Sequence, residues 1–254
     1  MRWPAIIFSR IKAFGETYDV FPRTEMPVSY EKYEDKRDKS ATTIFLLPSE
    51  NFDAKIVCPA GVKVGASAAL AAAAFLIHTR GLPLSECLIE TEEKTYRILQ
   101  DKKGKLKLTA PKCKQLFSNK PISIGMTEIF ISAVTDDLGA MVLTKCYDSD
   151  MFSGVALHRM QLLVDEKTPQ ILGSVAYSLS GENIKAKACQ TLKKTIDMPL
   201  RLATAIASSL VLPPGMDVTV TLNGVGFGFS AHGFGFAATP LDYSVFTLPL
   251  PDAF

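Results

Sequence analysis

The chain has 254 residues, a formal net charge of +2 and 47% hydrophobic residues. This apolar content excludes a disordered chain, which is too polar to bury a core. The charge comes from 28 basic and 26 acidic residues, and it argues against a dedicated nucleic-acid binder, because such proteins gather Lys and Arg on one face. The length allows one large domain or two of about 120 residues each.

Cysteine usage and hydropathy predict the compartment. The five cysteines are widely spaced without a CxxC pair, which favours a reducing compartment over a disulfide framework, and no His or Cys pair has zinc-ligand spacing. The longest apolar run, residues 66–77, is too short for the roughly 20 residues of a membrane-spanning helix. We therefore expect a cytoplasmic protein with no membrane partner, no nucleic-acid partner and no metal.

In chain order, short β-favouring segments separated by turn residues come first and predict strands. The first two strands, residues 42–47 and 54–58, each end at a proline. The next three, residues 87–91, 94–99 and 105–109, predict a meander.

Two other segments predict helices. Residues 68–79 are rich in Ala and free of Gly and Pro, with Ser67 as a candidate N-cap. Residues 202–210 follow Asp197, a possible cap, and Pro199 in the first turn. Both segments are apolar on nearly every face, so each helix should be buried by surrounding structure.

The two predicted helices occupy equivalent places in the two halves of the chain. Leu70 and Leu202 lie about half of the chain length apart, and each helix follows a short predicted strand that begins with Ala-Lys and ends with Cys, residues 54–58 and 186–189. Chance similarity of Ala-rich helices is the alternative to an internal repeat. The repeat predicts an α+β protein of two pseudo-symmetric lobes, residues 1–118 and 119–254, that meet near residues 117–121. Each lobe would be a curved, mostly antiparallel sheet wrapped around one buried central helix, at about 67–79 and 198–210.

The C-terminal region continues the strand pattern. After a predicted strand at 218–222, Gly alternates with Val and Phe over residues 224–229. One face of such a strand is bulky and the other is bare, and we expect the bare face to admit a helix at close range. A phosphate-binding loop is the weaker alternative, because no capped helix follows the glycines.

Several segments carry a resemblance to the diaminopimelate epimerase-like superfamily. Residues 1–27 are similar to the opening of its methylaconitate and methylitaconate isomerase branch. Residues 64–70 lie where the superfamily has a Cys-Gly-Asn turn before its first central helix. Residues 124–131 resemble the Gly-Asn-Pro strand of the second lobe, with Asp136-Asp137-Leu138 following as in many members, and residues 202–215 resemble the second central helix.

This resemblance implies proton transfer without a cofactor, in a cleft between the lobes. Members place one thiol from each lobe on opposite faces of a carbon acid; one thiolate removes the α-proton and the other thiol donates one. The N-termini of the two central helices hold the substrate carboxylate. The isomerase branch moves a proton across an allylic system. The resemblance thus implies a small carboxylic acid as ligand, unsaturated in the isomerase branch, and leaves a homodimer open.

The family motifs are altered at the chemistry-bearing positions. Val64 and Ile196 stand where the two thiols are expected, and the Gly-Asn turn has become Gly65-Ala66. A two-thiol mechanism is therefore not expected. The leading hypothesis remains a cofactor-independent isomerase of a small carboxylate, and the alternative is a catalytically inactive relative that binds a small acid or a protein partner.

Other side chains are candidates for the chemistry. We predict Asp197 as an acid–base group that faces Lys63 or Lys194 across the cleft, with a purely structural capping role as the alternative. Cys58 and Cys189 lie at related strand ends, one per lobe, and would restore a thiol pair, although buried cysteines are usually inert. Predicted substrate contacts come from the helix starts and the turn that opens the second lobe: Gly65, Ala66, Ser67, Thr127, Glu128 and Met198.

Overall fold

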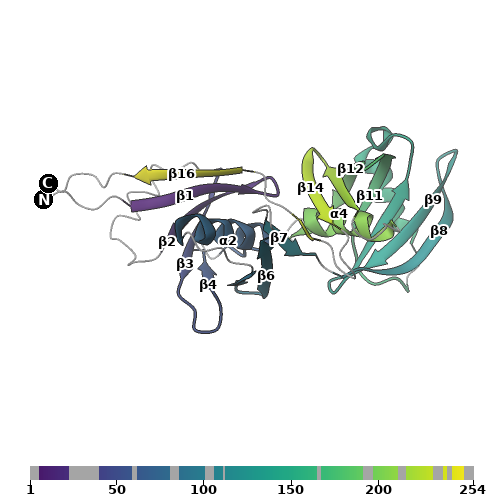
Figure 1. The fold of residues 1–254 in the computed structure, drawn as a ribbon. Coiled ribbons are helices and arrows are strands. Elements are labelled where there is room, and N and C mark those ends of the chain that lie inside the picture. The colour runs from purple at the N-terminus through teal and green to yellow at the C-terminus, as the bar shows by residue number, and fades with distance from the viewer. Residues whose placement is uncertain are drawn as a thin grey trace, which may run out of the picture. The chain divides into compact units, whose positions relative to one another are not determined.

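The computed structural model describes residues 6–22, 40–58, 62–80, 86–100, 106–110, 112–164, 167–190, 197–210, 216–230, 237–238 and 242–248. The chain divides into two compact units. The first comprises Met1–Leu108 with Thr239–Phe254, and the second comprises Thr109–Ala238. Each unit is a sheet that carries a helix on its face (Figure 1).

The first sheet has nine strands in the order β15-β7-β6-β5-β4-β3-β2-β1-β16. β2 pairs with β3 and β4 with β5 in parallel, and the other neighbours with a described register are antiparallel. The strands are β1 (Ile6–Ala13), β2 (Glu16–Pro22), β3 (Thr42–Leu47), β4 (Ala54–Val57), β5 (Glu86–Glu90), β6 (Thr95–Gln100), β7 (Leu106–Thr109), β15 (Ala237–Ala238) and β16 (Asp242–Leu248).

Helix α2 (Ala66–Arg80) packs against this sheet and contacts β1, β2, β4, β5 and β6. Ala68, Leu70 and Ala73 are completely buried, and the small alanine side chains let the helix backbone lie close to the strands. The buried helix predicted for residues 68–79 is confirmed. The reason is local: an Ala-rich segment without Gly or Pro has high helix propensity and no wet face.

The second sheet has seven strands in the order β14-β13-β12-β11-β10-β9-β8, with β10–β11 and β12–β13 parallel. Its elements are β8 (Lys114–Ile124), β9 (Thr127–Thr135), β10 (Ala140–Lys145), the 3-10 helix η1 (Ser149–Met151), α3 (Gly154–Leu162), β11 (Ile171–Ser180), β12 (Asn183–Gln190), α4 (Met198–Ser209), β13 (Asp217–Leu222) and β14 (Val225–Ser230).

Helices α3 and α4 lie on opposite faces of the second sheet. Leu157 of α3 packs in a buried cluster with Val142 of β10. Gly173, the partner of Met141 across β10 and β11, lies against α4. Because successive strand residues point to opposite faces, Val142 and Met141 face different helices. The second buried helix is confirmed, whereas α3 was not predicted from the sequence.

The observed division of the chain differs from the expected lobes. Residues 117–121, the expected meeting point, lie inside β8, and the units divide at Leu108 instead. β16 pairs antiparallel with β1, with Phe246 opposite Phe8, so the C-terminal segment returns to the first unit. Local patterns identify strands but not their distant partners, which is why the boundaries of 118 and 254 differ from those observed.

The prediction that the bare glycine face of β14 receives a helix is wrong at Gly226. Phe227 and Phe229 are buried, at 0% and 1% exposure, so the bulky face points into the core. A Cβ placed on Gly226 would meet no atom within 4 Å. The close approach occurs at Gly173, where a Cβ would lie 3.2 Å from Cδ2 of Leu202 in α4. No helix of the described residues is long and apolar enough to cross a membrane.

Candidate functional site

The start of α2 carries a hydrogen-bond network with β2. The Tyr18 hydroxyl donates to Oε2 of Glu16 at 2.5 Å and lies 2.7 Å from Oγ of Ser67. The Ser67 hydroxyl donates to the same Glu16 oxygen. Tyr18 and Ser67 are buried, whereas Glu16 is exposed. Two hydroxyls therefore fix one side of a carboxylate whose other side is open to solvent.

Ser67 is not the N-cap of α2. The helix begins at Ala66, and Ala69 N donates to Gly65 O at 3.0 Å, so Gly65 holds the cap position. The Ser67 side chain turns toward β2 instead. Gly65, Ala66 and Ser67, three of the predicted substrate contacts, thus lie together at this helix start, where first-turn N–H groups have no partner within the helix. Glu16 was missed, because nothing in its local sequence marks it as the partner of Ser67.

Lys63 lies just before this helix but is engaged elsewhere. Its Nζ is 2.8 Å from Oε1 of Glu93, and both side chains are exposed. The hydrogen bond to Glu93 and its charge raise the pKa of Lys63 above its ordinary value. A lysine base needs a lowered pKa, so this environment does not suit Lys63 to that role. The side chain of Val64, at the expected thiol position, is partly buried.

Asp197 stands at the start of α4, as expected, but its side chain makes no capping hydrogen bond. Its backbone is left-handed, with φ of 59°, a conformation that Asp tolerates better than most residues. The prediction that the Asp197 side chain caps this helix is therefore wrong. Met198 follows as a buried residue of the first turn. Lys194 and Ile196 lie outside the described residues.

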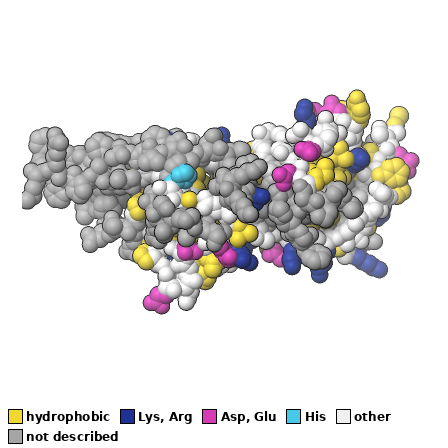
Figure 2. All heavy atoms as spheres, in the orientation of Figure 1, with side chains coloured by type: hydrophobic (Ala, Val, Ile, Leu, Met, Phe, Trp, Pro, Cys, Tyr) yellow, Lys and Arg dark blue, Asp and Glu magenta, His cyan; other side chains and the backbone are white. Residues whose placement is uncertain are grey.

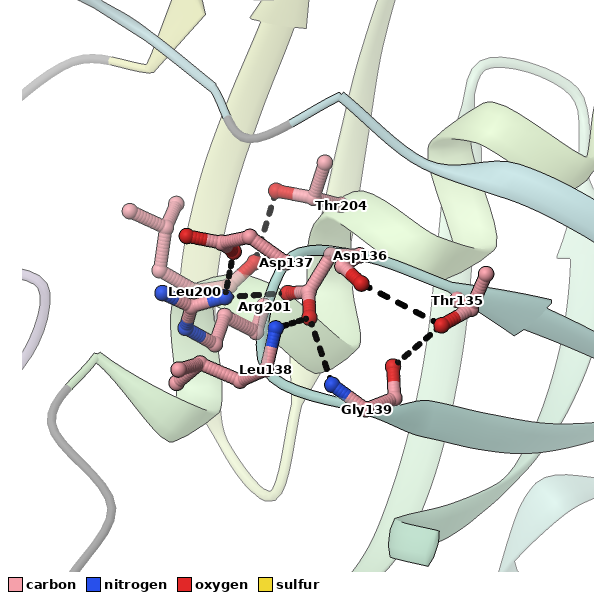
Figure 3. Close-up of polar contacts among 8 residues, drawn as sticks. All are labelled: Thr135, Asp136, Asp137, Leu138, Gly139, Leu200, Arg201 and Thr204. Carbon is pink, nitrogen blue, oxygen red and sulfur yellow. Dashed lines mark hydrogen bonds and ion pairs between the residues drawn. The ribbon is translucent and has the colours of Figure 1, made fainter. Parts of the chain in front are cut away.

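One turn into α4, Arg201 forms a buried ion cluster with the β9–β10 turn (Figure 3). Its Nη1 donates to Oδ2 of Asp136 and, at 2.7 Å, to Oδ1 of Asp137. The other Asp136 oxygen accepts from Leu138 N at 2.9 Å and Gly139 N at 3.2 Å. Burial lowers the pKa of Arg201, but the hydrogen bonds and charges of Asp137 and Asp136 outweigh it, so the pKa is raised. These contacts hold the β9–β10 turn against α4.

None of the five cysteines, all of which lie in the described ranges, forms a disulfide. Cys58 is buried, and its thiol donates to Thr43 O at 3.4 Å, which fits an inert residue. Burial raises the pKa of Cys113, close to Arg201 and Asp136, to about 11. Within the described ranges no group of three His, Cys, Asp or Glu side chains could hold a metal ion.

Thr127 and Glu128 lie far from the start of α4. They begin β9, after a turn at Gly125, and both are exposed. Asp136, beside Arg201, comes just after the other end of this strand. Eight residues of extended chain separate Glu128 from Asp136, which is about 25 Å. The structure therefore does not bring these two predicted contacts together with Asp197 and Met198.

No family model and no curated protein matches the sequence. Solved structures do match. A phenazine biosynthesis PhzC/PhzF protein from Clostridium difficile strain 630 superposes with a TM-score of 0.62 at 9% identity, covering 97% of this chain and 100% of that one. A PhzF-family protein from Enterococcus faecalis superposes with a TM-score of 0.61 at 11% identity, covering 96% of this chain and 99% of that one. The chain has the diaminopimelate epimerase-like fold.

A probable proline racemase from Agrobacterium radiobacter K84, with bound carbonate, is similar with a TM-score of 0.50 at 12% identity, covering 98% of this chain and 93% of that one. The expected fold class and its two lobes are thus confirmed. Identities this low show the fold alone. The methylaconitate isomerase branch stays a prediction.

Proposed function

We propose that the chain is a cofactor-independent isomerase that moves a proton within a small carboxylic acid. The observation that carries the proposal is the Glu16, Tyr18 and Ser67 network. The Tyr18 and Ser67 hydroxyls both donate to the Glu16 carboxylate, and Oγ of Ser67 lies on the first turn of α2. An acid–base side chain is thereby held beside the helix start where a small acid would bind, and its exposed face is open to that ligand.

The geometry favours a shift of a proton along one face of the substrate. Glu16 would remove a proton from an allylic carbon; the C–H bond breaks, an O–H bond forms, and the electron pair enters a dienolate. The same carboxyl would return the proton to the far carbon of that system, and the double bond moves by one position. Inversion at a single carbon needs a second group on the opposite face, whereas an allylic shift needs only one.

The start of α2 supports binding of the substrate carboxylate. Its first-turn N–H groups and the positive end of the helix dipole favour an anion. Gly65, Ala66 and Ser67 are the proposed contacts. Asp197, Lys194, Thr127, Glu128 and Met198 stay predictions from the sequence.

The alternative function is binding of a small acid without catalysis. Two observations favour it: Val64 occupies the expected thiol position, and Lys63 is paired with Glu93 rather than available as an acid–base group. The same helix start would serve as the anion site in this case.

Deuterium uptake distinguishes the two functions. Unsaturated di- and tricarboxylates are incubated with the protein in D2O, and exchange at the allylic carbons is followed by proton NMR. We expect uptake with the unchanged protein and a loss of about 100-fold or more in Glu16→Gln, the size of effect typical for an acid–base group. Glu50→Gln, an exposed carboxylate in the same unit, is the matched control.

The outcomes separate clearly. In one outcome, no acid tested takes up deuterium, but an acid binds to the protein and Ser67→Ala weakens this binding. That outcome would favour the non-catalytic alternative. Uptake that is equally fast in Glu16→Gln and the unchanged protein would rule out Glu16 as the base.

A further inference from the structure

A pocket of about 800 Å³ opens on the second unit. It lies among the first half of β9, the C-terminal ends of β10 and β11 and the bulged part of β8. It is a shallow depression that is wide open to solvent, so a ligand would lie against its floor rather than be enclosed. The lining residues are Asn119, Phe130, Lys145, Cys146, Tyr147 and Leu179.

The pocket shares the α4 face of the sheet but lies far from α4 itself. Lys145 is opposite Tyr177, and Met141 is opposite Gly173, so alternation puts Lys145 and Gly173 on one face. Gly173 contacts α4, whereas Leu179 lies six residues further along β11, about 20 Å away. The pocket is therefore separate from the Arg201 cluster. It also belongs to a different unit from the Glu16 network.

The pocket wall includes a backbone feature with a conformational cost. The pairing of β8 with β9 shifts register between Phe117 and Lys120, and Asn119, inside this bulge, has φ of 52°. Its N–H donates to Oγ of Ser132 at 3.2 Å, which holds the bulge in place. Bulges re-aim side chains and are frequent beside binding sites. Here the bulged residue is one that lines the pocket.

The lining combines exposed apolar groups with one cation. Phe130 is 57% exposed, Tyr147 99% and Leu179 40%, which is unusual for such large side chains. Figure 2 shows exposed hydrophobic side chains toward the β8–β9 end of this unit. Lys145 is exposed and makes no ion pair with any other described residue.

The acidic groups around the pocket limit the charge it accepts. Glu128 lies two residues before Phe130 on the same face of β9, and the Asp148 carboxylate follows Tyr147. Asp148 already accepts from Asp150 N at 2.9 Å as the cap of η1. The two carboxylates repel anions, so only direct pairing with the Lys145 ammonium can favour a carboxylate ligand, and a dianion is repelled more strongly than a monoanion.

We propose that this pocket binds a small aromatic monocarboxylate. The rings of Phe130 and Tyr147 and the Leu179 side chain contact the aromatic body, and the Lys145 ammonium pairs with the carboxylate. The Asn119 carboxamide is a further donor at the wall. This site is independent of the proposed isomerase reaction, because it uses none of the residues at the start of α2.

The test uses 1-naphthoate and its neutral analogue 1-naphthamide, titrated against the 15N-labelled full chain by NMR. We expect naphthoate to shift the amide resonances of Asn119, Lys145 and Tyr147. Lys145→Gln should weaken this binding about threefold to fivefold, the worth of a partly exposed ion pair, and naphthamide should bind the unchanged protein as weakly. Lys185→Gln, an exposed lysine on β12, is the matched control and should leave the affinity unchanged.

A second measurement does not depend on variants. Nuclear Overhauser effects between naphthoate protons and the ring protons of Phe130 are recorded on the unchanged protein, and we expect them because Phe130 lines the pocket. Equal affinity for naphthoate and naphthamide, or no nuclear Overhauser effect between naphthoate and the Phe130 ring, would overturn the proposal. A concentration-dependent dimer that Phe130→Ser abolishes, without any naphthoate binding, would overturn it in favour of a second copy of the chain. Because Glu16→Gln should not change naphthoate binding, failure here leaves the proposed isomerase function untouched.

Discussion

Replacing Asp136 with alanine should destabilise the second unit by about 4 kcal/mol, because it leaves the Arg201 cation buried without its main partner. The Asp136 side chain has 0% exposure and that of Arg201 has 5%. In addition, Nε of Arg201 is already a buried atom without a hydrogen-bond partner in the described part of the chain. Asp136→Ala would therefore remove a further hydrogen-bond partner from a guanidinium that already has one unsatisfied nitrogen.

The magnitude follows from three contributions. Breaking a buried ion pair by removing one partner costs about 3–5 kcal/mol. The remaining contact with Asp137 offsets about 1 kcal/mol at most, because that side chain is 69% exposed and screened by water. Loss of the hydrogen bonds from Leu138 N and Gly139 N costs about 1 kcal/mol in total, since the turn is partly solvated.

Urea denaturation followed by circular dichroism measures the change in the unfolding free energy, and hydrogen exchange of α4 peptides assigns it to the second unit. Asp137→Ala is the matched control and should cost no more than about 1 kcal/mol. Adding Arg201→Met to Asp136→Ala should recover part of the lost stability, because the unpaired cation is then removed.

Two outcomes would refute this reasoning. Equal destabilisation by Asp136→Ala and Asp137→Ala would mean that burial does not set the strength of the contact. No recovery in the double variant would mean that the cost of Asp136→Ala comes from the turn rather than from the stranded Arg201 charge.

Two further predictions concern packing and titration. Gly173→Ala should lower the free energy of unfolding, measured by urea denaturation, by about 2 kcal/mol, because its Cβ would lie 2.9 Å from Cys189 O and 3.2 Å from Leu202. Gly226→Ala, the control, should change it by less than about 0.5 kcal/mol, because its Cβ would meet no atom. Equal effects of the two variants would contradict the close packing at Gly173. Burial raises the pKa of Cys113 from 9.0 to about 11. Because the thiolate is the reactive form, alkylation of Cys113 at pH 8 should be about 100-fold slower in the folded than in the denatured chain. Peptide mass spectrometry should give a pH midpoint of alkylation near 11 for the folded chain. The folded state keeps this proton longer, so stability falls as pH rises from about 9 to about 11; a midpoint near 9 would contradict the effect of burial.

The elements themselves were predictable where the signal is local. Residues 42–47 have the bounds of β3, because a β-branched and aromatic run that ends at proline favours a strand. α2 was equally clear from its composition. α3 was missed, although Ser153 caps it by accepting from Ala156 N at 3.2 Å, because its short sequence has only a weak apolar pattern.

The candidate site was predictable only in part. The start of α2 was found, because a helix start is a local feature that also carries the resemblance to the superfamily. The role of its side chains was not, since Ser67 points to β2 rather than capping the helix. Lys63 illustrates the same limit: its partner Glu93 lies 30 residues away and removes it from consideration as a base.

By itself, the sequence determined the two buried helices and strands such as β3, because propensity, apolar pattern and turn residues act over a few neighbouring positions. It indicated the kind of fold through the resemblance of several segments to the superfamily. Only the tertiary structure decided which side chains meet. Tyr18 lies 49 residues from Ser67, and Asp136 lies 65 residues from Arg201. A polar group takes its partner from whichever strand or turn the folded chain brings beside it, and desolvation then makes that contact decisive.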